Sequence, residues 1–258
     1  MVDTPADKTR AGGVQSVARA LDILEVVDAA GGETSLSQIS AATGLPMPTI
    51  HRIVRTLVDR SYLRQLPDRR YALGTRLIPL GNSAREGFGA RAARELAAVV
   101  HEFGETVNLA TLDGDQLVYV GQVPSPRAMR MFTELGQHVQ PHCRAAGKAL
   151  LSRLPDDEVR ALLDRVGMPA MTPSTITDPD VLLRQLADVR TEGYATEDGE
   201  MELGVRCVAV PVPSEQGNFS ISLSAPESRL TDDVRDRALP VLRTVAERLA
   251  EQLEPGAA

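Results

Sequence analysis

The chain has 258 residues, enough for two modest domains, and 43% of them are hydrophobic, as in ordinary globular proteins. It contains neither an apolar run long enough to span a membrane nor a secretory signal segment, so we expect a cytoplasmic protein with no membrane partner. The net charge of −7 is unevenly distributed: residues 1–75 carry nine basic and eight acidic residues, and the remainder carries the acidic excess.

The N-terminal third is predicted to begin with a disordered arm followed by helices. Residues 1–13 are polar and rich in small residues, which is typical of disorder. A first helix is expected from about Ser16 to Ala29. A second should run from Leu36 to Thr43, because Ser35 can cap its start and Gly44 can end it.

A third helix is predicted to open with the segment Pro46-Met47-Pro48-Thr49, since proline is tolerated in a first turn. Its apolar residues recur at helical spacing and predict one buried face: Ile50, Ile53, Val54, Leu57 and Val58. The opposite face carries side chains that can donate hydrogen bonds to phosphates or base edges. Two helices joined by a glycine turn, the second with a cationic outer face, form the arrangement that enters a DNA major groove.

Two short strands, Tyr62–Leu66 and Arg70–Leu73, are predicted around a turn and would form the wing of a winged helix-turn-helix domain over residues 14–74. Between Ile50 and Arg76 there are seven arginines against two acids, so positive charge gathers where nucleic acid would lie. An amphipathic helix pair joined by glycine can imitate this pattern, which is the alternative. The predicted DNA-binding residues are Met47, Thr49, His51, Arg52, Arg55, Arg69 and Arg70.

Several motifs in combination resemble the IclR family of bacterial transcriptional regulators. They are Val14-Gln15-Ser16 with Ala20-Leu21-Asp22-Ile23-Leu24, Gly44-Leu45-Pro46 with Thr49-Ile50-His51-Arg52, and Tyr71-Ala72-Leu73-Gly74. The resemblance extends to about Leu253. It implies a linker helix over residues 75–90, of a kind that often pairs between subunits, and an effector-binding domain of GAF-like fold over residues 91–253. A simple spacer helix is the alternative for the linker.

The second domain is predicted to be α+β, because strands in its middle are flanked by helices. Asp113-Gly114-Asp115 between two alternating segments is a strong hairpin signal. Residues 254–258 are a tail. We expect strands at 106–112, 116–122, 129–132, 204–213 and 219–225, and helices at 92–103, 145–153, 156–165, 179–191 and 231–253, the last capped by Thr231.

Three stretches of the second domain are candidates for one pocket. They are His142–Lys148 at a helix start, Asp198–Cys207, and a strand whose alternation places the hydroxyls of Ser220, Ser222 and Ser224 on one side. The resemblance implies that this pocket binds a small organic or aromatic acid. The effector-binding positions that it implies are Ala145, Ala146, Asp198, Cys207, Ser222 and Ser224, with Met131 at the mouth.

Arg144 departs from the family pattern, which commonly has a small residue or Thr there. A guanidinium at the pocket edge would bind a carboxylate with two hydrogen bonds, so we include Arg144 among the effector-binding residues. The alternative is that Arg144 points outward and lies at a dimer contact. The three serines could instead form the solvent face of an edge strand, and Lys148 could be a helix-surface lysine.

Enzyme signatures are not found: the sequence has no Gly-x-Ser-x-Gly elbow, phosphate loop or paired His-Glu zinc motif, and we expect no cofactor. A metal- or thiol-dependent sensor or enzyme is the competing hypothesis, because His138, His142, Cys143 and Cys207 could gather a metal. Two buried thiols and two surface imidazoles would explain the same residues.

The sequence therefore predicts a DNA-binding regulator that is not an enzyme and whose operator affinity a small acid controls. One winged helix reads only a few base pairs, so we expect a homodimer on a pseudopalindromic operator. The resemblance suggests dimers of dimers.

Overall fold

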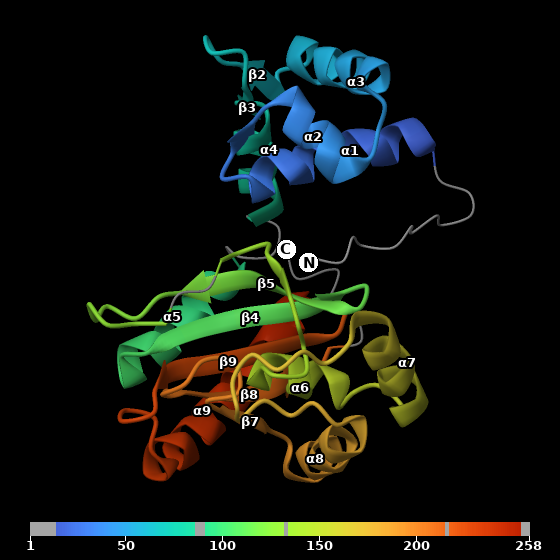
Figure 1. Cartoon of the computed structure of the whole chain (residues 1–258). Coiled ribbons are helices and arrows are strands. Elements are labelled where there is room, and N and C mark those ends of the chain that lie inside the picture. The colour runs from blue at the N-terminus through green and yellow to red at the C-terminus, as the bar shows by residue number, and fades with distance from the viewer. Residues whose placement is uncertain (1–13, 86–90, 132–133, 215–216, 254–258) are drawn as a thin grey trace. The chain divides into compact units, whose positions relative to one another are not determined.

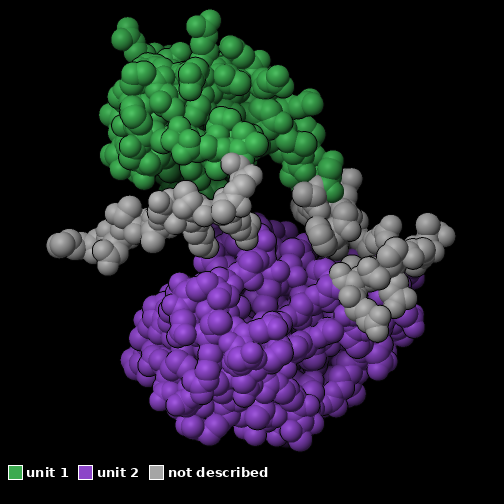
Figure 2. All heavy atoms as spheres, turned by 90° about the vertical axis from the view of Figure 1, so that its right-hand side faces the viewer, with its two compact units in different colours: residues 1–84 green, residues 85–258 purple. Residues whose placement is uncertain are grey.

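A computed structural model describes residues 14–85, 91–131, 134–214 and 217–253. The predicted arm, the predicted tail and Phe132 lie outside these residues. The chain divides into two compact units, residues 1–84 and 85–258, which Figure 2 draws in different colours. No helix in the described part of the chain is long and apolar enough to cross a membrane.

The first unit contains four helices and a three-stranded antiparallel sheet among its described residues. The helices are α1 (Gln15–Ala29), α2 (Leu36–Thr43), α3 (Met47–Asp59) and α4 (Leu77–Arg85). The strands are β1 (Glu33–Thr34), β2 (Leu63–Gln65) and β3 (Tyr71–Leu73), in the order β1-β3-β2. Its core joins all three leading helices to the first wing strand: Ile23, Val27, Ile39, Ile50, Val54, Leu57 and Leu63.

Local signals fix the helix ends in this unit, as predicted. The Ser35 hydroxyl accepts the Gln38 backbone N–H at 3.3 Å, and the side-chain Oε1 of Gln38 accepts the Ser35 backbone N–H at 3.0 Å, which makes a capping box. Gly44 ends α2 in the left-handed conformation, at φ 67°. The two-residue strand β1, which was not predicted, is too short to show a period.

The second unit is built on a six-stranded antiparallel sheet in the order β6-β5-β4-β9-β8-β7 (Figure 1). The long strands are β4 (Thr106–Asp113), β5 (Gln116–Val123), β8 (Val205–Val212) and β9 (Phe219–Pro226). The short edge strands are β6 (His138–Val139) and β7 (Ala195–Asp198).

Helices cover both faces of this sheet. The helices α5 (Arg91–Phe103) and α9 (Asp232–Leu253) pack on the face that carries Val107, Leu109 and Val208. The helix α6 (Ala145–Leu151) packs on the other face, against Ala110, Tyr119 and Ala209. Outside α6 lie α7 (Asp156–Val166) and α8 (Pro179–Glu192). Because successive side chains of a strand point to opposite faces, the sheet contributes to two hydrophobic cores, one on each face.

Two predictions about strands are wrong, and two edge strands were not predicted. Residues 129–131 form no strand; the carbonyl oxygens of Met129 and Met131 accept side-chain hydrogen bonds from Arg229 and Thr106 instead. The edge strands β6 and β7 were not predicted, because they are short and polar. The edge-strand alternative for the serines is also wrong, since β9 lies between β4 and β8.

Candidate functional site

The outer face of α3 presents most of the predicted DNA-binding residues. Because Ile50, Val54 and Leu57 turn into the core, His51, Arg52 and Arg55 are exposed on the opposite side. Met47 is exposed and Thr49 half-buried at the helix start. A surface groove between α3 and the wing is lined by His51, Arg52 and Arg55 and by three residues that were not predicted to bind DNA: Val58, Gln65 and Tyr71. Gln65 and Tyr71 pair across the two wing strands.

The two wing arginines differ in their surroundings. Arg69 lies in the turn with a φ of 67°, a backbone conformation uncommon outside glycine. Arg70 is held by two acids, with nitrogen to oxygen distances of 3.0 Å to Glu33 and 2.7 Å to Asp68. Its hydrogen bond lowers the pKa of the Asp68 carboxyl. Arg70 therefore braces the wing against β1, whereas Arg69 has no acidic partner within 4.0 Å among the described residues.

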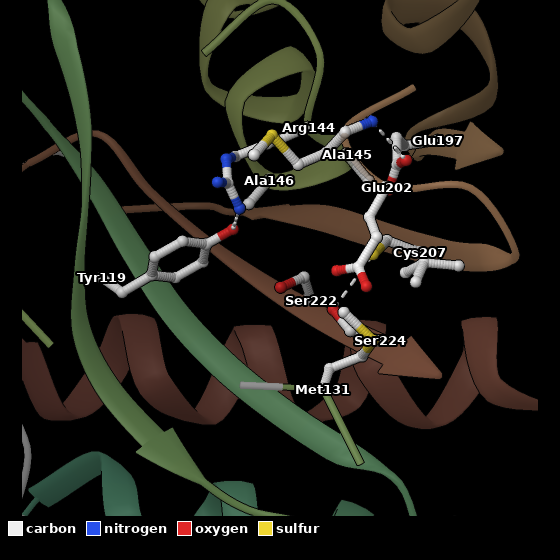
Figure 3. Close-up of a pocket in the computed structure, with 12 residues that line it drawn as sticks. Tyr119, Met131, Arg144, Ala145, Ala146, Glu197, Glu202, Cys207, Ser222 and Ser224 are labelled. Carbon is white, nitrogen blue, oxygen red and sulfur yellow. Dashed lines mark hydrogen bonds between the residues drawn. The ribbon is translucent and has the colours of Figure 1, made fainter. Parts of the chain in front are cut away.

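In the second unit, a cavity of about 120 Å³ lies where α6 begins, between β5, β8 and β9 (Figure 3). Seven of the eight predicted effector-binding residues line it. Five further residues line it. Met201, Glu202 and Val205 fall within the predicted stretch Asp198–Cys207 but were not among the named effector-binding residues, whereas Tyr119 on β5 and Glu197 on β7 lie outside the predicted stretches.

The eighth predicted residue, Asp198, does not line this cavity. Its carboxylate pairs with Arg206, at 2.6 Å to Nη2, beside a separate hollow. The preceding residue, Glu197, lies in the cavity and is only 3% exposed. Because successive side chains of a strand point to opposite faces, Glu197 and not the predicted Asp198 faces this cavity.

Glu197 is held in place by main-chain donors. One of its carboxylate oxygens accepts the N–H groups of Glu200 at 2.8 Å and Met201 at 3.1 Å. Burial raises the pKa of this carboxyl, while those two hydrogen bonds act in the opposite direction. Glu197 therefore fixes the start of the β7–β8 connection as well as lining the cavity.

Arg144 faces the cavity, so the alternative of an outward arginine is wrong. It stands at the N-cap of α6 in an extended conformation, and its Nη1 lies 3.5 Å from the Tyr119 hydroxyl (Figure 3). Its guanidinium carbon lies 5.8 Å from the centre of the Tyr119 ring. The buried Nε–H of Arg144 has no hydrogen-bond partner in the described part of the chain. A buried donor without a partner indicates a place for an acceptor.

Tyr119 remains a neutral hydroxyl beside this guanidinium. Burial raises its pKa to about 12, although the nearby charge of Arg144 lowers it. At neutral pH the hydroxyl can therefore donate a hydrogen bond as well as accept one.

The sulfur and hydroxyl groups of the cavity are packed rather than reactive. Ser220 is fully buried and donates to the Ala146 carbonyl at 3.0 Å, while Ser222 and Ser224 line the cavity. The Cys207 sulfur lies 3.1 Å from the Ser224 hydroxyl. Burial raises the pKa of the Cys207 thiol well above its usual value, so little thiolate exists at neutral pH. This disfavours a thiol-dependent enzyme.

Lys148 is fully buried and pairs with the Glu200 carboxylate, so the helix-surface alternative is wrong. The whole of α6 is buried, and Lys148 therefore cannot reach solvent. His142 is also buried, contrary to the surface imidazole suggested by the sequence, with Nε2 3.2 Å from the Pro169 carbonyl. His138 is exposed and pairs with Asp113. Within the described residues, no three His, Cys, Asp or Glu side chains are grouped as metal ligands.

Comparison with known proteins gives matches over both units. Residues 16–67 match the IclR helix-turn-helix domain, and residues 86–251 match the C-terminal domain of the bacterial transcriptional regulator IclR. The acetate operon repressor of Salmonella typhimurium is 36% identical over 235 residues, which is 86% of this chain and 84% of that protein. The transcriptional repressor IclR of Escherichia coli is 35% identical over the same shares.

Solved structures of IclR-family regulators are similar to this chain as well. An IclR transcriptional regulator from Alicyclobacillus acidocaldarius has a TM-score of 0.84 and 31% identity, covering 94% of this chain and 100% of that one. An IclR homolog from Microbacterium hydrocarbonoxydans, complexed with 4-hydroxybenzoate, has a TM-score of 0.78 and 25% identity, covering 93% and 99%.

Proposed function

This chain belongs to the IclR family of bacterial transcriptional regulators, and we propose that a small carboxylate bound in the cavity of its second unit controls how tightly α3 and the wing bind operator DNA. The first unit is a helix-turn-helix DNA-binding domain and the second is an effector domain. Binding of an acid would shift the population between arrangements that do or do not match the operator.

The observation that carries this proposal is Arg144. Its guanidinium lines the cavity with a buried, unpaired Nε–H, and the Tyr119 hydroxyl lies beside it. A carboxylate could accept from both groups in a charge-assisted hydrogen bond, which is roughly twice as strong as a neutral one. The carboxylate ligand named for the Microbacterium homolog is in keeping with an acid.

For DNA, the free cations support α3 as the reading helix. Arg52 and Arg55 are exposed and have no acidic partner within 4.0 Å among the described residues. We infer that Arg69 contacts phosphate from the wing tip and that Arg70 positions the wing, since its charge is already matched by Glu33 and Asp68.

The test begins with an operator selected by the purified full chain from random DNA. Arg52→Ala or Arg55→Ala should weaken binding to it by about 1 to 3 kcal/mol if the arginine contacts a base, with the loss confined to particular operator positions. Arg94→Ala, an exposed arginine on α5, is the matched control. Full affinity in the Arg52/Arg55 double variant would show that α3 is not the reading helix.

A second experiment tests the effector by measuring operator affinity with and without saturating small aliphatic and aromatic acids. We expect one class of acid to change affinity by roughly 5- to 150-fold, the usual range of coupling between two sites. Arg144→Gln should abolish that change. Operator affinity that no acid alters would contradict acid control while leaving DNA binding intact.

A further inference from the structure

The end of the cavity opposite Arg144 is acidic. Glu202 lines the cavity from the β7–β8 connection, and Figure 3 shows its carboxylate directed toward Ser222 and Ser224, away from the guanidinium of Arg144. Glu202 is exposed on its outer side, so it stands at the mouth. Its carboxylate has no hydrogen-bond partner among the described residues, unlike Glu197, whose Oε1 is occupied by two N–H groups.

The segment that carries Glu202 is anchored on several sides. The Thr172 hydroxyl donates to the Gly199 carbonyl at 2.6 Å, and the Thr175 hydroxyl donates to the Glu200 carbonyl at 2.5 Å. The Glu200 side chain forms the buried ion pair with Lys148.

The two ends of the β7–β8 connection are also joined to each other, because the Gly199 N–H donates to the Val205 carbonyl at 2.8 Å. The backbone on both sides of Glu202 is therefore fixed. Glu202 therefore extends toward the cavity from a backbone that these hydrogen bonds hold in place.

A carboxylate at this place is unfavourable for a simple acid. An effector whose far end is a hydrocarbon would displace water from the cavity side of the Glu202 carboxylate and offer it no hydrogen bond in exchange. Its carboxylate would also add a negative charge to a cavity that Glu197 and Glu202 already line, where Arg144 is the one basic residue among the described lining residues. An effector with a donor at its far end would satisfy Glu202 directly.

We propose that the effector is a small acid that carries a hydrogen-bond donor, an amino or hydroxyl group, at the end opposite its carboxylate, and that Glu202 is the residue that selects this donor. The inference rests on the proposed acid control and narrows the class of acid. A site built to hydrogen-bond a polar substituent rejects the analogue that lacks it more strongly than an apolar pocket rejects an extra group. An amino group, being a cation, should be favoured over a hydroxyl.

The experiment measures Kd by calorimetry, with the full chain, for matched sets of acids that share one skeleton. Each set holds the unsubstituted acid, its terminal hydroxy form and its terminal amino form, for example butanoate, 4-hydroxybutanoate and 4-aminobutanoate, or benzoate with its para-hydroxy and para-aminomethyl forms. The variants are Glu202→Gln and, as a control for the same charge change at an exposed site on α7, Glu158→Gln.

In at least one set we expect wild type and Glu158→Gln to bind a donor-bearing acid at least about tenfold more tightly than the unsubstituted acid, which is about 1.4 kcal/mol. Glu202→Gln should reduce that ratio to about threefold or less, and more for the amino form than for the hydroxy form. The fold should be unaffected, because Glu202 is an exposed residue of a loop.

Several results would overturn the inference. Equal Kd values across each set in wild type would show that no donor is selected, and an unsubstituted acid that still shifted operator affinity would leave the proposed function standing. A preference that persisted in Glu202→Gln would assign the selection to another residue. No binding by any acid would overturn the inference and the acid-effector proposal together.

Discussion

At the scale of single residues, Lys148 and Glu200 form an ion pair inside the second unit. Both side chains are removed from water, at 0% and 8% exposure, and one carboxylate oxygen of Glu200 has no partner among the described residues. Charges leave water only at a cost of several kcal/mol each, which their mutual attraction must offset. Either charge alone would be strongly unfavourable in the same place.

Lys148→Met should therefore lower the free energy of unfolding by about 3 to 5 kcal/mol, because it leaves the Glu200 carboxylate buried without a counter-charge. Lys148→Met combined with Glu200→Met should recover most of that loss, since the double variant buries no charge. Urea unfolding followed by circular dichroism measures both. A double variant as unstable as the single would mean that the ion pair itself, and not the uncompensated charge, stabilises this region.

His142 gives a pH dependence with a definite sign. Burial lowers its pKa below the usual 6.5, the positive charge of Lys148 lowers it further, and the Pro169 carbonyl opposes them. The unfolded chain then binds a proton that the folded chain does not, so this contribution to stability falls as pH falls through about 6.5. Glu197 acts in the opposite direction, because its raised pKa gives a contribution that is lost as pH rises above 4.5.

The comparison that isolates His142 is His142→Gln, whose side-chain amide can still donate to the Pro169 carbonyl. We expect the stability difference between wild type and this variant to shrink on going from about pH 8 to about pH 5.5, since only wild type must carry a buried imidazole that resists protonation. Calorimetric unfolding at each pH supplies the values. A difference that stays constant with pH would show that His142 keeps its ordinary pKa.

At the scale of elements, α6 sets the geometry of the cavity, because it brings Arg144, Ala145 and Ala146 to one edge. Its close approach to the preceding chain depends on Gly147. A Cβ at that position would lie 2.1 Å from the Pro141 carbonyl oxygen, which is far closer than atoms can pack. Gly81 in α4 offers the opposite case, with nothing within 4 Å of its Cβ position.

Gly147→Ala should destabilise the protein by about 1 to 3 kcal/mol and weaken effector binding, since α6 must move to relieve the contact. Gly81→Ala should instead be neutral or stabilising by up to about 1 kcal/mol, because alanine is the better helix former. Denaturant unfolding of the two variants tests the pair. Equal effects at the two positions would contradict the tight packing of α6.

At the scale of the whole molecule, the first unit exposes apolar side chains that a monomer would not need. Val14, the N-cap residue of α1, is 67% exposed, Val17 and Leu21 on α1 are 55% and 52% exposed, and Ile78 on α4 is 62% exposed. Their repetition on α1 at helical spacing suggests a partner surface. We propose that a second copy of this chain covers them, in keeping with the two half-sites of a pseudopalindromic operator.

Val17→Asp combined with Leu21→Asp should weaken or abolish the dimer, because burying two carboxylates in an apolar interface is costly. Light scattering gives the mass, and the operator Kd should rise in parallel, since each half-site would then bind alone. Val181→Asp, an exposed apolar residue at the start of α8, is the matched control. An unchanged mass for the double variant would place the dimer contact elsewhere.

By itself, the sequence determined the elements whose signals are local. Ser35 and Gly44 set the two ends of α2, and the apolar residues from Ile50 to Val58 orient α3 toward the core. The Asp113-Gly114-Asp115 turn joins β4 to β5. Thr231 caps α9 as expected, with the Val234 N–H 3.4 Å from its hydroxyl. Each of these signals operates over three or four residues, the range in which backbone hydrogen bonds and helical periodicity act.

Only the tertiary structure decided which side chains meet in the cavity. Its lining includes residues from β5, α6, β7, the β7–β8 connection, β8 and β9. No local pattern places Tyr119 beside Arg144 or turns Glu202 toward the cavity. The choice between Glu197 and Asp198 required the register of a four-residue edge strand, and the burial of Lys148 required its distant partner Glu200. Side-chain direction in a strand reverses with each residue, and a buried charge is tolerated only where long-range folding supplies its counter-charge.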